Sequence, residues 1–449
     1  MNHSAQPETP AWLGSAVAWL SPRRLRAQSV VLALCLWGVC AVDFATPGFF
    51  DRAGNIKFQD FLPFYVSARL IAQGRAGELY NQQVIAAEIE AIVHPASIQP
   101  GSGHRGAALP SANVRPANVQ LPNLYGPQVG LLFVPLSRFS FPAAAWIWVA
   151  ASLIAFFGCV YLLWRASPVL RPHSRIVGIS ALAFPPLFHF FVRGQISVLV
   201  LACFTVTFLA LRADRSWLAG AALGLLVFKP QFLIAIPLLL LLARAWKTLA
   251  GLSASAFAQL AFAWIYFGSA VMRAYLDTLW HMSRWIGTAE LRLANIQMHS
   301  LRSFWALLIP WPDAALVLYI LSSVVVIVIA AAVWKSASPL ALRFSALTLA
   351  AVLVNPHLFV YDLLALAPVL LLLADSALNN QQHPFSADLR WLSYLAFVLP
   401  LFAPLSRWTH FQPSVPVFAL LLWVLFRHSA NVAERAANDR LASQQARVV

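Results

Sequence analysis

The stretch "AALVLYILSSVVVIVIAAAVW", Ala314 to Trp334, is an apolar run without a charge, and it decides the fold class. A helix needs about 20 such residues to cross a hydrocarbon core roughly 30 Å thick. Only 10% of the 449 residues are charged and 60% are apolar, whereas roughly a quarter of the residues of a soluble globular protein are charged. Strands that alternate apolar and polar residues, as a membrane barrel requires, are absent. We therefore expect an all-α polytopic membrane protein.

Apolar length and the basic joints between apolar runs predict about twelve transmembrane helices. Both ends of the chain are then cytoplasmic: residues 1–27 form an N-terminal segment, 28–427 the membrane domain and 428–449 a tail. Two long segments, 47–142 and 269–313, fall on the outer side, and the first is expected to carry amphipathic helices. The predicted spans lie near 28–46, 143–164, 174–192, 195–212, 216–228, 230–243, 249–268, 314–334, 338–354, 358–375, 390–404 and 413–427.

The net charge of +15 does not indicate nucleic-acid binding, because the basic residues form no single patch with interleaved aromatic residues. They occupy short joints between apolar runs, which is typical of cytoplasmic loops. The N-terminal stretch "SPRRLRAQSVVLALCLWGVCAV" has the charge and apolar core of a signal peptide but no clear A-x-A site. We interpret it as an uncleaved signal anchor.

Three local patterns near the outer side predict a broken helix, a short segment that does not cross the membrane, and a capped helix. The short segments 216–228 and 230–243 meet at Lys229-Pro230, and broken helices of this kind tend to line a cavity. The stretch "LRSFWALLIPWP" has only about ten apolar residues, which favours a re-entrant or interfacial segment. Residues 61–73 should form a helix with Asp60 as its N-cap, Pro63 in its first turn and Gly74 at its end.

This topology brings polar residues from six distant parts of the chain to the outer ends of helices. Ionisable residues at membrane depth are costly, so the set is a candidate functional site. Arg193, Lys229 and Arg302 would form a cationic floor for a phosphate, and Asp60 could act as a base. The set comprises Asp43, Asp60, Arg193-Gly194-Gln195, Lys229, His299 with Arg302, and Asn355-Pro356-His357.

Each of these residues also has a structural interpretation. Asp60 could simply cap a helix, Arg193 and Lys229 could be interfacial side chains, and His357 could bridge backbone groups in a tight turn. Arg69 lies about 180° around an ideal helix from Asp60 and ranks lower. The sequence has no HxH, HExxH or DxD pattern, so we predict neither a metal nor a cofactor. Hydrolase, ATPase and dinucleotide-binding motifs are also absent.

Five ordered stretches resemble the bacterial glycosyltransferase family 87 over about residues 30 to 375. No single stretch is specific, whereas the ordered set is. Better-known members of this family are polyprenyl-phosphate-mannose-dependent mannosyltransferases with the GT-C membrane fold. The stretches are "QDFLPFYVSARLIAQGRAGELY", "LYGPQVGLLFVPLSRFSFPAAAWIW", "RGQISVLVLACF", "LAGAALGLLVFKPQFLIAIPLLLLLARAW" and "VNPHLFVYDLLAL".

The resemblance implies roles for particular residues. Asp60 corresponds to the general base, and Tyr65, Ala68 and Arg69 belong to the same motif. The Gly-Gln pair corresponds to Gly194-Gln195 and the Lys of the broken-helix joint to Lys229, while His299 and His357 remain cavity candidates. Where family members often have Tyr-Pro-Pro, this chain has Tyr125-Gly126-Pro127, which places the shape of that loop in question.

The residues and the resemblance together predict an inverting transfer of a hexose, with mannose first, from a polyprenyl-phosphate donor to a lipid or glycan acceptor. The phosphate would contact Arg193, Lys229 and Arg302, and Asp60 would take the acceptor proton. The enzyme would lie in the inner (plasma) membrane with its site facing the periplasm or exterior. The alternatives are a transporter or flippase for a lipid-linked or anionic solute, a GT-C enzyme that ligates a glycan or transfers another sugar, and a structural membrane partner.

Overall fold

The computed structural model describes residues 20–93, 123–285, 296–379 and 384–445, and these residues fold into helices without a strand. Seven stretches in this part of the chain are long and apolar enough to cross a membrane. The protein is therefore an all-α polytopic membrane protein. The stretches are α2 (Pro22–Phe44), α6 (Phe141–Ala166), α12 (Trp246–Trp285), α15 (Pro312–Lys335), η9 with α17 (Val360–Asn379), α18 with η10 and α19 (Pro384–Thr409), and α20 (Ser414–Gln445).

The other predicted spans are also helical, but they are shorter or bent. The pair α7 (Ser174–Leu182) and α8 (Pro185–Arg193) bends by 47° at its break. Helices of 10–17 residues extend only about 15–25 Å, which is less than the roughly 30 Å of a hydrocarbon core. The full count of about twelve crossings therefore stays a prediction. These shorter stretches are α9 (Ser197–Arg212), α10 with η7 (Ser216–Phe228), η8 with α11 (Pro230–Leu242) and α16 (Leu340–Leu353).

Two helices extend beyond the predicted limits of the membrane domain, residues 28–427, and a third helix has the short length predicted for it. Helix α2 already begins at Pro22, where the Ser21 side chain accepts a hydrogen bond from the Arg24 amide, so residue 27 lies inside a helix. Helix α20 continues past residue 427 to Gln445. The stretch after Ser300 forms the eight-residue helix α14 (Leu301–Leu308), which is too short to cross a bilayer, as predicted.

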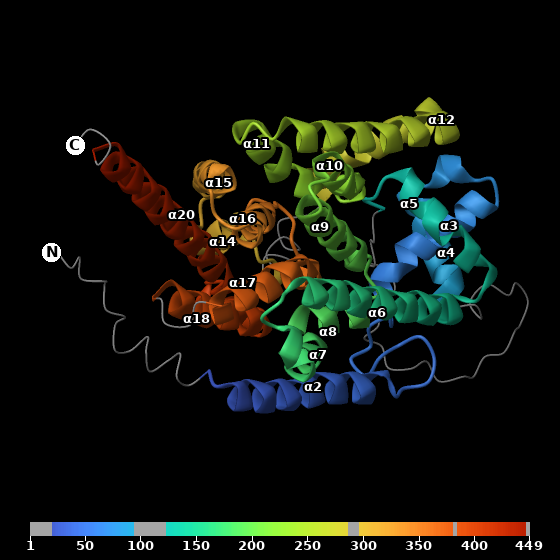
Figure 1. Cartoon of the computed structure of the whole chain (residues 1–449). Coiled ribbons are helices and arrows are strands. Elements are labelled where there is room, and N and C mark those ends of the chain that lie inside the picture. The colour runs from blue at the N-terminus through green and yellow to red at the C-terminus, as the bar shows by residue number, and fades with distance from the viewer. Residues whose placement is uncertain (1–19, 94–122, 286–295, 380–383, 446–449) are drawn as a thin grey trace, which may run out of the picture.

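The segment η9 (Val360–Leu366) lies among the helices, and both α8 and α9 pack on it. Figure 1 shows α2 and α6 along one side with α7 and α8 between them, and α12 along the opposite side with α10. Helices α3 (Leu62–Ala72), α4 (Gln82–Val93) and α5 (Pro127–Phe133) gather at one end. Helix α2 begins and α20 ends on the side away from them (Figure 1).

Glycines allow α10 and α12 to approach closely. A Cβ atom added at Gly220 would lie 1.9 Å from the Thr248 carbonyl oxygen, and one at Gly251 would lie 2.1 Å from the Trp217 carbonyl oxygen. Lipid tails are as apolar as the side chains, so association inside a membrane depends on such close van der Waals packing. The two helices therefore require small residues at these contacts.

The predicted helix over residues 61–73 is confirmed as α3, and it is not amphipathic, because residues 62–68 and Leu70 are all buried. Gly74 follows its end with φ +73°, in the left-handed conformation that favours glycine. The prediction that Asp60 is its N-cap is wrong. The chain enters α3 through the 3₁₀ turn η1 (Gln59–Phe61), so Phe61 takes the N-cap position and the Asp60 side chain is free to bond elsewhere.

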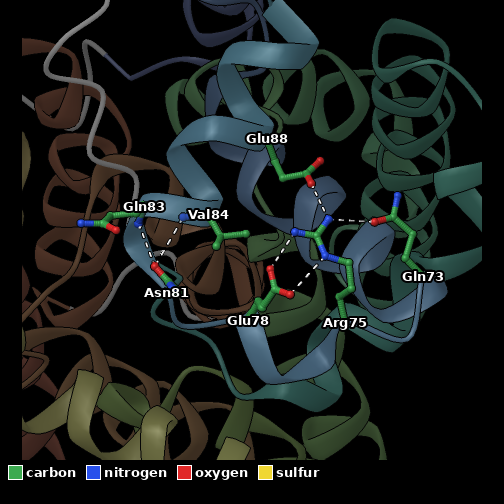
Figure 2. A network of polar contacts seen from close by, with 7 residues as sticks. All are labelled: Gln73, Arg75, Glu78, Asn81, Gln83, Val84 and Glu88. Atoms are coloured by element: carbon green, nitrogen blue, oxygen red, sulfur yellow. Dashed lines mark hydrogen bonds and ion pairs between the residues drawn. The ribbon is translucent and has the colours of Figure 1, made fainter.

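A charged network holds α4 against the turn that follows α3 (Figure 2). The Arg75 guanidinium lies 2.6 Å from Glu78 and 2.7 Å from Glu88, and it also donates to Gln73. The Asn81 side chain caps α4 by accepting hydrogen bonds from the amides of residues 83 and 84. Helix α4 buries one face, made by residues 85, 89 and 93. This small helical unit supports the turn that carries Asp60.

Candidate functional site

The Asp60 carboxylate lies among polar groups from the joint between α8 and α9. Its Oδ2 atom accepts a hydrogen bond of 3.0 Å from the Gln195 amide, and its Oδ1 atom lies 3.7 Å from the Arg193 guanidinium. The Asp60 side chain is 14% exposed and that of Arg193 is 32% exposed. Asp60 is thus oriented by a neutral amide and a more distant cation, while part of it still reaches solvent.

Gly194 determines how closely η1 approaches this joint. It ends α8 in the left-handed conformation, with φ +70°, and a Cβ atom there would lie 3.0 Å from the Phe58 Cβ and 3.1 Å from the Phe61 Cβ. Trp148 fixes the next residue, because its indole donates to the Gln195 carbonyl over 3.2 Å. The sequence Arg-Gly-Gln therefore presents a cation and an amide to Asp60 from one tight turn.

A second charged pair lies deeper in the helix bundle. The Lys229 ammonium contacts the Asp362 carboxylate, and both side chains are almost fully buried, with 1% and 2% exposed. The Ser197 hydroxyl joins the pair: it lies 3.0 Å from the Lys229 Nζ and 2.6 Å from an Asp362 oxygen. Lys229 precedes Pro230, and a proline disfavours helical geometry in the residue before it. The break between η7 (Leu225–Phe228) and η8 (Pro230–Leu233) places Lys229 at this point.

Aromatic rings connect the two charged pairs. The Lys229 Nζ lies 6.0 Å from the centre of the Tyr125 ring and 5.5 Å from that of Tyr361. The Tyr125 hydroxyl lies 3.4 Å from the Gln195 side-chain oxygen. Asp60, Arg193, Gln195, Lys229 and Asp362 thus belong to one connected polar cluster, which we call the Asp60 cluster together with Ser197, Tyr125 and Tyr361.

Burial shifts the pKa values of two groups of this cluster, Asp60 and Tyr125. It raises the pKa of the Asp60 carboxyl above its ordinary value, while the Arg193 charge and the Gln195 hydrogen bond oppose that rise. Burial also raises the pKa of Tyr125 well above its ordinary value, and the charges of Asp362 and Asp60 raise it further. Tyr125 is therefore a protonated phenol and a hydrogen-bond donor, whereas Asp60 is a stronger base than an ordinary aspartate.

Of the two predicted histidines, His357 lies close enough to the cluster for the charges of Asp362 and Lys229 to act on it, and both rings are neutral. His299 is fully buried, its amide donates to the Leu358 carbonyl over 2.9 Å, and its Nδ1 lies 2.7 Å from the Ser414 hydroxyl. Burial lowers the pKa of His299 to about 3 and that of His357 to about 4. The His357 amide donates to the Asn355 side chain, which is the tight-turn bond anticipated from the sequence. Neither ring adds positive charge at neutral pH.

The remaining predicted residues take different positions. Arg302 is exposed in the first turn of α14, and its charge acts on His357, as do those of Lys229 and Asp362. Tyr65 is buried and donates to the Phe139 carbonyl over 2.7 Å, so it anchors α3 to the chain before α6. The sequence predicted a cationic floor of Arg193, Lys229 and Arg302 with Asp60 beside it. In the structure the Asp60 carboxylate faces Arg193, and the Asp362 carboxylate, which the sequence did not single out, engages Lys229. Of the three cations, Arg302 is the exposed one.

The sequence analysis missed Asp362, Ser197 and Tyr361 as members of the cluster. Asp362 stands inside the apolar run "VYDLLAL", and an acid in such a run is the same signal that identified Lys229. Among the described residues, no group of three or more His, Cys, Asp or Glu side chains is arranged to hold a metal ion.

Comparison with known protein families identifies the chain. Residues 123–356, slightly more than half of the sequence, match glycosyltransferase family 87. The chain belongs to glycosyltransferase family 87. Searches of curated proteins and of solved structures returned no match. The family region contains Arg193, Gln195 and Lys229, whereas Asp60 and Asp362 lie outside it. Membership therefore establishes a membrane glycosyltransferase, and the roles of the two aspartates rest on their geometry.

Proposed function

We propose that this glycosyltransferase moves a hexose, with mannose the first candidate, from a polyprenyl-phosphate donor to a lipid or glycan acceptor with inversion at the anomeric carbon. The architecture would be of the GT-C type. The observation that carries the proposal is the environment of Asp60: a half-buried carboxylate held at 3.0 Å by an amide and at 3.7 Å by a guanidinium. A general base needs a fixed position and a free lone pair, and this arrangement provides both.

In the proposed reaction, the acceptor hydroxyl oxygen attacks the anomeric carbon from the face opposite the phosphate. The bond between that carbon and the phosphate oxygen breaks, and the polyprenyl phosphate leaves with the bonding electrons. Asp60 takes the hydroxyl proton as the new glycosidic bond forms. The transition state resembles an oxocarbenium ion, so proton transfer can occur late and a carboxylate of modest basicity suffices.

Asp60 suits this role better than Asp362. Asp362 is 2% exposed, and its carboxylate is already engaged by Lys229 and Ser197. A base in such a pair would have to break it and leave a buried ammonium without a partner, which is costly. We therefore assign Asp362 to the support of the site and Asp60 to the chemistry.

The leaving phosphate needs fixed positive charge. Arg193 is 32% exposed and touches Asp60 with one of its nitrogen atoms, and a guanidinium has five N–H donors. Arg302 is exposed and lies near enough for its charge to act on His357. We propose that these two arginines contact the phosphate, and that Lys229 supports the site through Asp362 and the Tyr125 ring.

The distribution of basic residues supports the orientation that we propose. Arg24 and Arg26 lie at the start of α2. Arg165 lies in the last turn of α6, Arg171 in the segment between α6 and α7, and Arg175 in the first turn of α7. Basic residues of this kind favour the cytoplasmic side. Asp60 follows the opposite end of α2, so the cluster would face the periplasm or exterior of an inner (plasma) membrane.

The experiment that tests this function uses the full-length protein in proteoliposomes with radiolabelled donors. Polyprenyl-phosphate mannose should give a labelled product with a native lipid and glycan extract, and a nucleotide-linked mannose should give none. An inverted anomeric centre in the product supports the mechanism. Transfer from the nucleotide donor, or labelled donor crossing the bilayer without any product, would contradict it; the second result would favour the flippase alternative.

A further inference from the structure

Two adjacent cavities lie beside the start of α2, and none of the residues that line them belongs to the Asp60 cluster. The smaller one has a volume of about 270 Å³ and is lined by Arg26, His173 and Arg175. The larger one has a volume of about 520 Å³ and is bounded by α2, α6, α7, α17 and α18. Pro22, His173 and Ile176 belong to the walls of both cavities, so the basic one opens beside the larger one.

The larger cavity is a groove between membrane helices with a predominantly apolar lining. Its walls include Leu32 of α2, Phe156 of α6 and Leu371 of α17. Its volume is in the range of about 300–1,000 Å³ that is usual for small-molecule sites. In a bilayer the apolar molecules at hand are lipids, so a groove among candidate spans should contain a hydrocarbon chain.

The basic cavity is complementary to an anion. Arg26 and Arg175 are both exposed there, and no Asp or Glu is among the residues that line either cavity. The Asp375 carboxylate next to the groove is engaged, because it accepts a hydrogen bond of 2.9 Å from the amide of Leu170, a groove residue. Basic pockets between membrane helices are typical sites for lipid phosphates.

Three buried polar atoms in the wall of the groove have no hydrogen-bond partner among the described residues. They are Gln28 Oε1, Arg390 Nε and Ser393 Oγ. Buried polar groups are normally satisfied, so such atoms call for an explanation. The ester carbonyls of a phospholipid could accept from Arg390 and Ser393, at the boundary between its headgroup and its chains.

We propose that the two cavities together bind one anionic phospholipid of the surrounding membrane. Its phosphate contacts Arg26 and Arg175, and one acyl chain occupies the groove between α2 and α18. This site is separate from the site proposed for sugar transfer, and the proposal of lipid binding does not depend on that function.

The test measures lipid binding to the full-length protein in detergent by native mass spectrometry, with phosphatidylglycerol and phosphatidylcholine of identical chains as probes. The double variant Arg26→Gln/Arg175→Gln should bind phosphatidylglycerol about tenfold more weakly, because each basic residue contributes several-fold to the affinity. The matched control, Arg23→Gln/Arg24→Gln, removes the same number of charges, both from the start of α2, and should bind like wild type, since neither residue lines either of these two cavities.

A second pair of variants tests the groove. Ala374→Phe places a ring inside it and should weaken phosphatidylglycerol binding, whereas Ala143→Phe, on an exposed position of α6, should not. Equal binding of the two lipids, or equal weakening by the Arg23/Arg24 control, would overturn the proposal. Binding of glycerol phosphate as tight as that of the lipid would also overturn it, because the groove would then contribute nothing.

Discussion

The buried pair of Lys229 and Asp362 should be a major determinant of stability, and replacing either partner tests this. Both side chains are almost inaccessible, with 1% and 2% exposed, so water cannot solvate a charge left behind. Lys229→Met or Asp362→Asn alone should therefore lower the free energy of unfolding by about 3–5 kcal/mol, the usual cost of breaking a buried ion pair. The double variant removes both charges and should come within about 1–2 kcal/mol of wild type.

The assay is reversible unfolding of the full-length protein in detergent micelles with increasing dodecyl sulfate. The two single variants and the double variant form a cycle, and its coupling energy should be about 3 kcal/mol or more. Glu78→Gln is the internal control. The pair of Arg75 and Glu78 is also short, at 2.6 Å, but 38% of each side chain is exposed, so the control should lower the free energy of unfolding by at most about 1 kcal/mol. Additive losses, or single variants as stable as wild type, would refute the assignment of a buried ion pair.

Three further predictions concern the approach to Asp60, its protonation and helix packing. Gly194→Ala should lower turnover at least tenfold, because the added methyl group would press on η1 and displace Asp60; wild-type turnover would show that this contact does not position the base. The rate should fall toward acid pH with a midpoint above the ordinary aspartate value, since only the carboxylate accepts a proton. Arg193→Gln should move that midpoint to higher pH, because Arg193 lowers the pKa of Asp60. An unchanged pH profile would show that the group whose titration controls the rate is not Asp60. Gly220→Val should lower the free energy of unfolding by about 3 kcal/mol in the same detergent assay, because α12 backbone lies 1.9 Å from the new Cβ atom; Gly158→Ala, with open space around it, should have little effect.

The positions of the helices could be predicted because they depend on short-range features. The length of the apolar runs and the basic residues between them predicted the spans, and each predicted span is helical in the structure. Pro63 and Gly74 marked the two ends of α3. The break at Lys229-Pro230 was also predictable, because a proline acts on the residue just before it. How many of the shorter helices cross the bilayer depends on the membrane around them, which residue counts do not determine.

The pairing of side chains could not be predicted in the same way. Lys229 and Asp362 are 133 residues apart, and Asp60 and Gln195 are 135 residues apart. The sequence placed Lys229, Asp60 and Gln195 at the ends of helices on one side, but it missed Asp362 and did not show which cation faces which carboxylate. The mistaken role of Asp60 as an N-cap has the same origin, since local sequence favours a cap and a distant amide provides its actual partner.

The central claim is that Asp60 accepts the proton of the acceptor, and a comparison of turnover and donor binding in Asp60→Asn and wild-type protein tests it most directly. Donor binding should change less than threefold, because the asparagine keeps the shape and a hydrogen-bond acceptor for Gln195. Turnover with polyprenyl-phosphate mannose should fall by about 10²–10⁴-fold, the usual contribution of a general base. Turnover within tenfold of wild type at unchanged donor binding would contradict the assignment of Asp60 as the base.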